Sequence, residues 1–435
     1  MDATPFQDRQ EEALLSAIGQ PTAAERLASL GQRLERFAAG EMTLPQATDY
    51  VNNHIHTTYS FSPYTPGDAA YRAWLNGLTT AGIMDHDSVS GAEEFIRAGE
   101  ILGVATTVGF ECRCSVAGTP FEGRRLNNPD QISVAYVACH GIPHQNIGRA
   151  SAWLAPYRER RNERNRQMVQ RINALTKEEA LQLDFDRDVL PLSMNREGGS
   201  VTERHLLYAL ALRMISVYGA GAKIPELLTG KLSIALDGKA QKALEDENNP
   251  FYAYNLLGVL KSSMVEHIYI DATAECPHVS EFTAFCHDIG AIPAYAYLGD
   301  VGVSVTGDKK TQTFEDSFLD ELVPWLAQNG FESITYMPTR NSAAQLERLI
   351  ALCAKHNLFE ISGEDINSPT QSFICQALTK PEFSHLIRST WALIGHEKAA
   401  SLNVEDGMFT PKTLQTEPSL QTRIQHYAAI GRARE

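Results

Sequence analysis

The sequence lacks a long apolar run and a paired-cysteine motif, and no leader pattern is readable in its first residues. No stretch of about 18 consecutive apolar residues occurs in the 435-residue chain, which argues against a membrane-spanning helix. The seven cysteines are odd in number and never form Cys-x-x-Cys, so we expect no disulfide framework. The first residues show no basic region followed by an apolar one, so we expect no signal peptide. Together these absences predict a soluble cytoplasmic protein with reduced thiols and no membrane partner.

Positive charge is also scarce. Lys and Arg total 38 against 53 Asp and Glu, which gives a net charge of −15. A surface of that sign repels nucleic-acid backbones and anionic lipids, so we expect no general nucleic-acid binding. A small phosphorylated ligand stays compatible with this charge, because metal ions or a few basic groups can reverse the sign inside one cleft. The composition, 43% hydrophobic and 21% charged, excludes disordered, collagen-like and coiled-coil chains.

Short apolar runs alternate with amphipathic segments over two parts of the chain, a pattern typical of βα units in a parallel sheet or barrel. In the N-terminal region, Leu14, Leu15 and Ile18 recur at helical spacing. We therefore predict an α/β protein with five segments: a helical N-terminal extension over 1–45, a first βα part over 46–150, a helical insertion lobe over 151–265, a second βα part over 266–400 and a loosely held C-terminal tail over 401–435. The oligomeric state cannot be predicted.

Local patterns predict individual elements. Short strands are expected at 82–84, 106–110 and 266–271. Ser90 with Glu93, and Thr176 with Glu179, have the spacing of capping boxes at helix starts.

A long charged helix is expected over residues 158–175. Its arginines alternate with acidic residues, and we interpret them as a solvated helix face rather than as a nucleic-acid-binding surface. These arginines are Arg158, Arg160, Arg161, Arg164 and Arg166.

Potential metal ligands follow short apolar runs, at the points where strands would end in loops. They are His54, His56, His86, Glu111 and Asp365. In a closed βα barrel the C-terminal ends of the strands meet on one face, so residues far apart in sequence would converge there. Two histidines separated by one residue on extended backbone point to the same side and can reach one ion. Arg340 would follow a strand at the same face, where it could pair with a substrate phosphate.

Each of these patterns has a simpler interpretation. A His-x-His pair is commonly a surface or core pair, residues 85–87 resemble a turn, and Glu111 could mark a strand edge. Arg340 is equally compatible with a solvated loop. The ordered series of candidate ligands at successive strand ends favours a metal site over these separate explanations.

The same ordered series resembles the PHP (polymerase and histidinol phosphatase) superfamily of metal-dependent phosphoesterases, in particular its small members with a helical insertion. The segments that resemble the family's motifs are, in chain order, 54–60 (His-Ile-His-Thr-Thr-Tyr-Ser), 82–87, 108–111, Arg204-His205 and 362–367. The last of them is similar to a closing Gly-x-Asp-x-His element. The likeness covers about residues 50–370.

The resemblance implies a distorted TIM-like barrel of about seven βα units and hydrolysis of a phosphate ester through metal-activated water. Divalent Mn, Fe or Zn ions are implied, and we expect one or two of them. The implied metal ligands are His54, His56, His86, Glu111, His140, His205, Asp365 and Asn367. Glu111, His86 and Asp85 are the expected catalytic residues. Arg204 joins Arg340 as a candidate for substrate binding.

Three positions depart from the family pattern. Phe61 stands where the family usually has Asp, Tyr297 where a His is typical, and Asn367 where the closing His is found. We therefore expect Phe61→Asp to restore a ligand and raise the metal content. The departures leave two alternatives open. One is a PHP barrel that binds a metal or ligand with reduced or no hydrolytic activity, and the other is a barrel metallohydrolase acting on C–N bonds.

Overall fold

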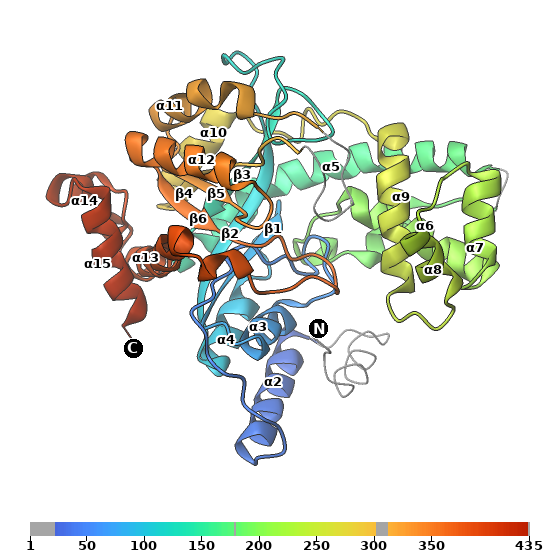
Figure 1. The fold of residues 1–435 in the computed structure, drawn as a ribbon, viewed down its shortest axis with the longest axis horizontal. Coiled ribbons are helices and arrows are strands. Elements are labelled where there is room, and N and C mark those ends of the chain that lie inside the picture. The colour runs from blue at the N-terminus through green and yellow to red at the C-terminus, as the bar shows by residue number, and fades with distance from the viewer. Residues whose placement is uncertain (1–21, 178–179, 302–311, 434–435) are drawn as a thin grey trace.

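A single curled sheet forms the centre of the structure, a computed structural model that describes residues 22–177, 180–301 and 312–433 (Figure 1). Its strands are β1 (Thr80–His86), β2 (Ala105–Ser115), β3 (Val134–His140), β4 (Ile292–Ala296), β5 (Ser333–Tyr336) and β6 (Phe359–Ser362). They follow one another across the sheet in sequence order. Neighbours are parallel except at β3, which runs antiparallel to both β2 and β4.

The reversal of β3 follows from its connection. Residues 116–133 join β2 to β3 without a crossover helix, and a connection that returns along the same sheet edge gives an antiparallel pair. The α/β class is thus confirmed. The seven regular βα units of a TIM-like barrel stay a prediction, because six strands form the described sheet and one of them is reversed.

An extended segment lies between the two ends of this sheet. Ile55 donates from its backbone nitrogen to Gly82 at 3.0 Å, and Met84 donates back to Ile55 at 3.0 Å, which attaches the segment to β1. On its other side, His56 donates to the backbone oxygen of Ile366 at 2.9 Å. Ile366 follows β6, so residues 53–56 bridge the first and last strands of the curled sheet.

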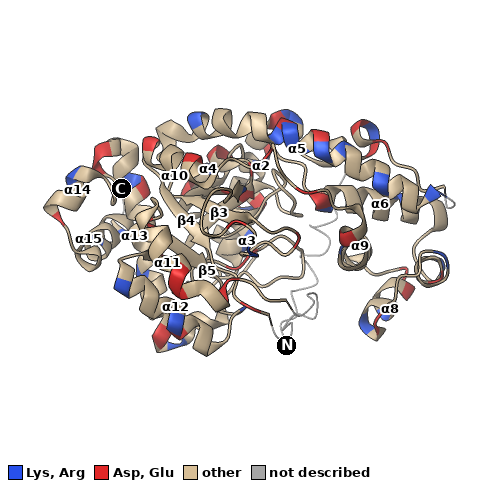
Figure 2. Ribbon diagram, turned by 90° about the horizontal axis from the view of Figure 1, so that it is seen from above, with Lys and Arg blue, Asp and Glu red and all other residues tan. Residues whose placement is uncertain are grey.

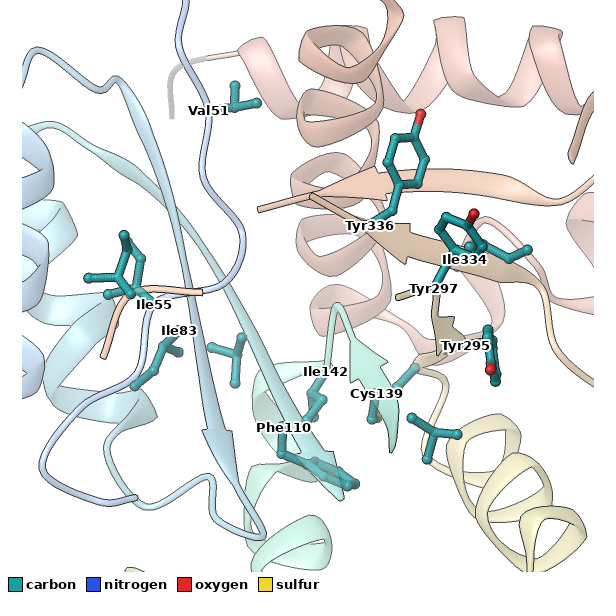
Figure 3. Close-up of a cluster of buried hydrophobic side chains, with 14 of the residues drawn as sticks. Val51, Ile55, Ile83, Phe110, Cys139, Ile142, Tyr295, Tyr297, Ile334 and Tyr336 are labelled. Carbon is teal, nitrogen blue, oxygen red and sulfur yellow. The ribbon is translucent and has the colours of Figure 1, made fainter. Parts of the chain in front are cut away.

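Helices cover the outer face of the sheet (Figure 1). They are α3 (Pro66–Leu75), α4 (Ala92–Leu102), α10 (Val279–Asp288), α11 (Leu319–Gln328) and α12 (Ala343–His356), and α2 (Ala23–Ala38) packs on α3 and α4. Between sheet and helices, Phe110, Cys139, Tyr295 and Ile334 from successive strands join one buried cluster (Figure 3). Helix α2 lies within the expected N-terminal extension, whereas Leu14, Leu15 and Ile18 lie outside the described residues.

The insertion lobe stands to one side of the sheet (Figure 1). Its helices are α5 (Ile147–Leu175), α6 (Glu203–Tyr218), α7 (Lys223–Glu226), α8 (Gly238–Glu245) and α9 (Tyr252–Ile268). The strand predicted at 266–271 is wrong, because α9 continues to Ile268. Leu257, Leu260, Met264 and Ile268 recur every three to four residues and are all buried, so the helical period extends through this region.

The capping box predicted at Ser90 is wrong, whereas the one predicted at Thr176 includes a residue outside the described part of the chain. Helix α4 begins after Gly91 with no side-chain cap, and the hydroxyl of Ser90 instead donates to the backbone oxygen of Gly198 at 3.3 Å. Thr176 ends α5, where its hydroxyl donates to the backbone oxygen of Ile172 at 2.9 Å. Its expected partner, Glu179, lies outside the described residues.

The C-terminal region is helical and packed, so the loosely held tail predicted after residue 400 is wrong. Helices α13 (Ser384–Leu402), α14 (Pro411–Thr416) and α15 (Leu420–Arg432) follow β6. Helix α13 packs against residues of β4 and β6 that face inward, and α15 covers it from outside. Among the helices of the described residues, none combines the length and apolarity needed to cross a bilayer.

Two glycines allow α13 and α15 to touch through their backbones. A Cβ atom at Gly395 would lie 1.8 Å from the carbonyl oxygen of Tyr427, and one at Gly431 would lie 2.0 Å from that of Trp391. The expected effect of Gly395→Ala is a loss of at least about 1–3 kcal/mol in the free energy of unfolding, since the helices must separate. Urea denaturation measures this loss.

Gly258→Ala is the matched control. Gly258 is an exposed residue of α9 with open space around its Cα. Alanine should stabilise that helix by about 1 kcal/mol. Equal effects of the two substitutions would contradict the close packing of α13 on α15.

Candidate metal centre

The carboxylate of Glu111 lies among three imidazoles. Its Oε1 atom is 3.5 Å from Nε2 of His54, 3.3 Å from Nε2 of His56 and 3.1 Å from Nδ1 of His86. The parallel register of β1 and β2 places His86 directly opposite Glu111. Residues 53–56 lie along the other edge of β1, which brings His54 and His56 to the same point.

A second carboxylate reaches this cluster from the loop after β6. Oδ1 of Asp365 lies 3.1 Å from Nε2 of His56. The backbone of the next residue, Ile366, donates to the oxygen of His54 at 3.1 Å, which fixes the loop beside the histidines. The structure therefore brings together the five candidate ligands that follow strand ends in the sequence.

Two imidazole nitrogens in this cluster are buried without a directed hydrogen bond to any described residue. They are Nε2 of His54 and Nε2 of His56. Ligand atoms of His54, His56 and Glu111 all lie within 4.8 Å of one another. Buried polar atoms normally find a partner, and a divalent cation would satisfy imidazole nitrogens and carboxylate oxygens together. The residues present therefore fit a metal ion.

Asp85 fixes the tautomer of His56 through Ser60. Both oxygens of Asp85 accept hydrogen bonds, from the nitrogen and hydroxyl of Thr57 at 2.7 and 2.6 Å and from the Ser60 hydroxyl at 2.6 Å. Since that hydroxyl hydrogen is used, the Ser60 oxygen accepts from Nδ1 of His56 at 3.2 Å. In the neutral tautomer that this contact selects, the lone pair of His56 lies on Nε2, where it can reach an ion. Asp85 thus positions a ligand.

The charges of the cluster shift the pKa values of its members. Burial alone would raise the pKa of Glu111, but the imidazoles of His86 and His54 outweigh it and lower the pKa to about 2. Burial lowers the pKa of His86 to about 4. For His54 burial is also the largest influence, yet the nearby carboxylates of Glu111 and Asp365 together outweigh it and raise the pKa to about 9. Without a metal, His54 therefore carries a proton near neutral pH.

His140 and His205 do not join this group. His205 caps the start of α6, where its Nδ1 accepts from the backbone nitrogen of Thr202 at 3.0 Å. His140 is buried at the end of the reversed strand β3, on the same side of the sheet as Glu111. Burial lowers the pKa of both imidazoles to about 3, so both are neutral. Their expected role as ligands stays a prediction.

Phe61 belongs to the core of the insertion lobe. Its ring lies 4.9 Å from that of His205 and 5.6 Å from that of Tyr208, both in edge-on contact. The side chain is buried with the apolar residues of α5, α6 and α9. The place where the family usually has a carboxylate is therefore filled by packing.

Arg204 and Asn367 meet beside Asp365. The amide nitrogen of Asn367 donates to Oδ1 of Asp365 at 2.5 Å, and Arg204 donates to the amide oxygen of Asn367 at 2.5 Å. Arg340 lies in the turn after β5. Its neighbour Thr339 donates to the carboxylate of Glu364 at 2.7 and 2.8 Å, which places that turn next to the Asp365 loop.

The interpretation of the α5 arginines as a solvated helix face is only partly right. Arg160 and Arg166 are exposed, as a solvated face requires, but Arg158, Arg161 and Arg164 are buried. Figure 2 shows basic and acidic residues along this helix. Arg158 donates to the backbone oxygen of Asp87 at 3.0 Å, whereas Arg161 and Arg164 meet acidic partners.

These partners form a network of buried and half-buried charges that the sequence did not reveal. Its members are Arg113, Arg161, Arg164, Asp87, Glu203 and Glu275. Glu203 is the hub, because Arg113 contacts it at 3.1 Å, Arg161 at 2.9 Å and Arg164 at 2.5 Å. Arg113 and Arg164 each contact Glu275 at 2.8 Å, and Arg161 pairs with Asp87. Three positive and three negative groups balance.

Comparisons with known proteins extend this description. No family model matches the sequence, and no curated protein matches it. Among solved structures, a “putative metal-dependent phosphoesterase” from Bifidobacterium adolescentis is 20% identical with a TM-score of 0.50, over 80% of this chain and 97% of that one. An amidohydrolase from Chromobacterium violaceum, solved with bound sulfate and no metal, is 16% identical with a TM-score of 0.48. The match covers 75% of this chain and 90% of that one.

A third solved structure is a two-domain protein from Bacteroides vulgatus containing a “predicted PHP-like metal-dependent phosphoesterase”. It is 11% identical with a TM-score of 0.28, over 76% of this chain and 57% of that one. The name of the first structure agrees with the expected resemblance to metal-dependent phosphoesterases. At 20% identity, the likeness to the Bifidobacterium protein supports the fold and leaves the activity to be argued from the site.

Metal binding should strengthen as the pH rises. An ion needs the neutral imidazole of His54, whose pKa in the metal-free protein is about 9. Affinity for Mn²⁺ is therefore expected to increase about tenfold per pH unit between about pH 6.5 and 8.5, with about one proton released per ion. Calorimetric titration in two buffers of different ionisation enthalpy counts that proton. An affinity that does not change over this range would contradict His54 as a ligand.

The packing of Phe61 reverses the outcome expected for Phe61→Asp from the sequence. The new carboxylate would be buried among aromatic rings of the lobe, so the free energy of unfolding should fall by about 3–5 kcal/mol. Metal content should not rise. Elemental analysis and urea denaturation test both statements, with Phe61→Leu as the control that keeps an apolar side chain. An additional ion bound by Phe61→Asp would show that the packed pocket can open.

Proposed function

We propose that this protein is a metal-dependent phosphoesterase that hydrolyses a small phosphorylated substrate. The proposal is carried by the convergence of His54, His56, Glu111 and Asp365, with two buried imidazole nitrogens that lack a directed hydrogen bond. Imidazole and carboxylate ligands together suit Mn²⁺, Fe²⁺ or Zn²⁺, and we propose one or two such ions per chain.

The charge of the site supports a divalent ion. Glu111 and Asp365 are both ionised, since neighbouring imidazoles hold the pKa of each carboxyl below its usual range against the effect of burial. Once His54 gives up its proton, two negative charges are left, and one divalent cation neutralises them. When bound, such an ion would polarise a phosphoryl oxygen and lower the pKa of a water molecule.

His86 is our candidate for proton transfer. Its side chain is 26% exposed, against 11% for His54 and 1% for His56, so it is the most accessible imidazole of the three. With a pKa of about 4 it is neutral near pH 7 and can accept a proton or a metal ion. Glu111 would hold the ion and keep the three imidazoles oriented, while Asp85 holds the tautomer of His56.

A small substrate fits the charge of the whole protein. The net charge of −15 disfavours a polyanion, whereas a single phosphate group can be drawn to a bound cation. We propose that Arg340, in the turn after β5, contacts that phosphate. Its guanidinium would supply the bidentate geometry that phosphate oxygens favour.

A second candidate function is a metal- or ligand-binding protein without hydrolytic activity. The packing of Phe61 in the lobe core favours it, because a position that usually supplies a ligand in the family is closed. This candidate predicts bound metal with no turnover, and the same experiment separates the two.

His54→Ala is expected to remove the bound metal and to reduce hydrolysis to background, because it deletes a ligand from the buried cluster. Elemental analysis counts the ions per chain, and a panel of phosphomonoesters and phosphodiesters with added Mn²⁺ measures turnover. His267→Ala is the matched control, since His267 is exposed at the end of α9 and pairs with Glu266 on the surface.

Metal content unchanged in His54→Ala would defeat the site assignment. Metal bound by the wild-type protein without turnover of any ester in the panel would favour the binding protein instead.

A further inference from the structure

A continuous chain of hydrogen bonds connects the insertion lobe to the Asp365 carboxylate. Arg204, at the start of α6, donates from Nη1 to the side-chain oxygen of Asn367 at 2.5 Å and to its backbone oxygen at 3.2 Å. The amide nitrogen of Asn367 donates to Oδ1 of Asp365 at 2.5 Å. That same Oδ1 atom lies 3.1 Å from Nε2 of His56.

The chemistry of the three groups fixes their orientation. A guanidinium has only donors and a carboxylate only acceptors, so the group between them must accept on one side and donate on the other. The amide of Asn367 does this without a charge of its own. An Asp at this position would place two carboxylates in contact, and an apolar residue would leave both neighbours without the link.

The lobe holds Arg204 in place from two directions. The guanidinium lies over the ring of Phe61, 5.8 Å from its centre, and that ring is part of the lobe core. The preceding residue, Glu203, is fixed at the start of α6 by Arg161 and Arg164 of α5. The donor end of the chain is thus attached to the packed body of the lobe.

The Asp365 loop is held independently by Gln371. The side-chain oxygen of Gln371 accepts from the backbone nitrogen of Asn367 at 2.8 Å, and its nitrogen donates to the backbone oxygen of Asp365 at 2.7 Å. This clamp fixes the backbone of the loop, so the Asn367 amide is left to set the rotation of the Asp365 carboxylate.

We infer that Arg204 and Asn367 are positioning residues that orient the Asp365 carboxylate from the insertion lobe, rather than a substrate-binding group and a metal ligand. The inference rests on the proposed function, because it takes Asp365 to be a ligand. The lobe then contributes to metal affinity without a ligand of its own. Residues that orient ligands commonly change metal affinity about 10- to 100-fold when they are removed.

The test uses Asn367→Leu, Arg204→Met and the double variant, each in the full-length protein. Asn367→Leu and Arg204→Met should each weaken Mn²⁺ binding about 10- to 100-fold, and the double variant should be little worse than either alone. Arg204→Lys, which keeps a donor, should recover part of the affinity. Arg213→Met is the matched control, because Arg213 is an exposed arginine on the same helix. Electron paramagnetic resonance of free Mn²⁺ gives the dissociation constants.

The competing roles give different results. If Arg204 binds substrate, Arg204→Met raises KM and leaves the Mn²⁺ affinity unchanged, and this result would overturn the inference. If Asn367 is a ligand, Asn367→His restores or improves binding while Arg204→Met has no effect, with the same consequence.

A metal-free measurement separates this inference from the proposed function. The urea midpoint of the metal-free double variant should fall by less than the sum of the two single shifts, because both substitutions break one chain of contacts. A wild-type protein that binds no Mn²⁺ would defeat the proposed function, while non-additive midpoints would still support the link between Arg204 and Asn367. Additive midpoints would overturn that link.

Discussion

The candidate site depends on the backbone hydrogen bonds that hold residues 53–56 between β1 and the segment after β6. These bonds place His54 and His56 on the inner side of a sheet whose other members supply Glu111 and Asp365. No side chain is needed for that placement, so the positions of the ligands follow from the closure of the sheet. The side chains then add a finer adjustment, because Ser60 selects the tautomer of His56.

The balanced charge network has a comparable role for the lobe. Three of its four members outside α5 lie within two residues of a site residue. Asp87 follows His86, Arg113 lies two residues after Glu111, and Glu203 precedes Arg204. Taking charges out of water is costly, and a network of this kind adds little net stability compared with apolar packing. Its directed contacts instead define one position for α5 against the sheet, so the lobe has one orientation relative to the sheet.

The sequence predicted the site better than its surroundings. Strand-end placement was enough to identify His86 and Asp365, because parallel strands deliver their C-terminal ends to one edge. Glu111 was found although the strand predicted at 106–110 continues to Ser115, and it reaches the site because it pairs with His86 across β1 and β2. The sequence could not show that β3 is reversed, since periodicity carries no information on strand direction. The buried arginines were missed because their charge suggested solvent. A signal was present, however, as Arg161 and Arg164 precede Met168 at the helical spacing of a buried face. The lobe packing of Phe61 depends on contacts between segments far apart in sequence, which a single sequence does not display.

Helix α13 lies across the inner face of the sheet, at the end of the strands away from Glu111. Ala392 and Leu393 pack there against Ile292 and Phe359, and Glu397 accepts from the hydroxyl of Thr107 at 2.8 Å. The curled sheet is therefore closed at this end by the packed side chains of α13. A molecule therefore cannot reach the ligands from this side of the sheet, because the packed side chains of α13 and the strands fill the space.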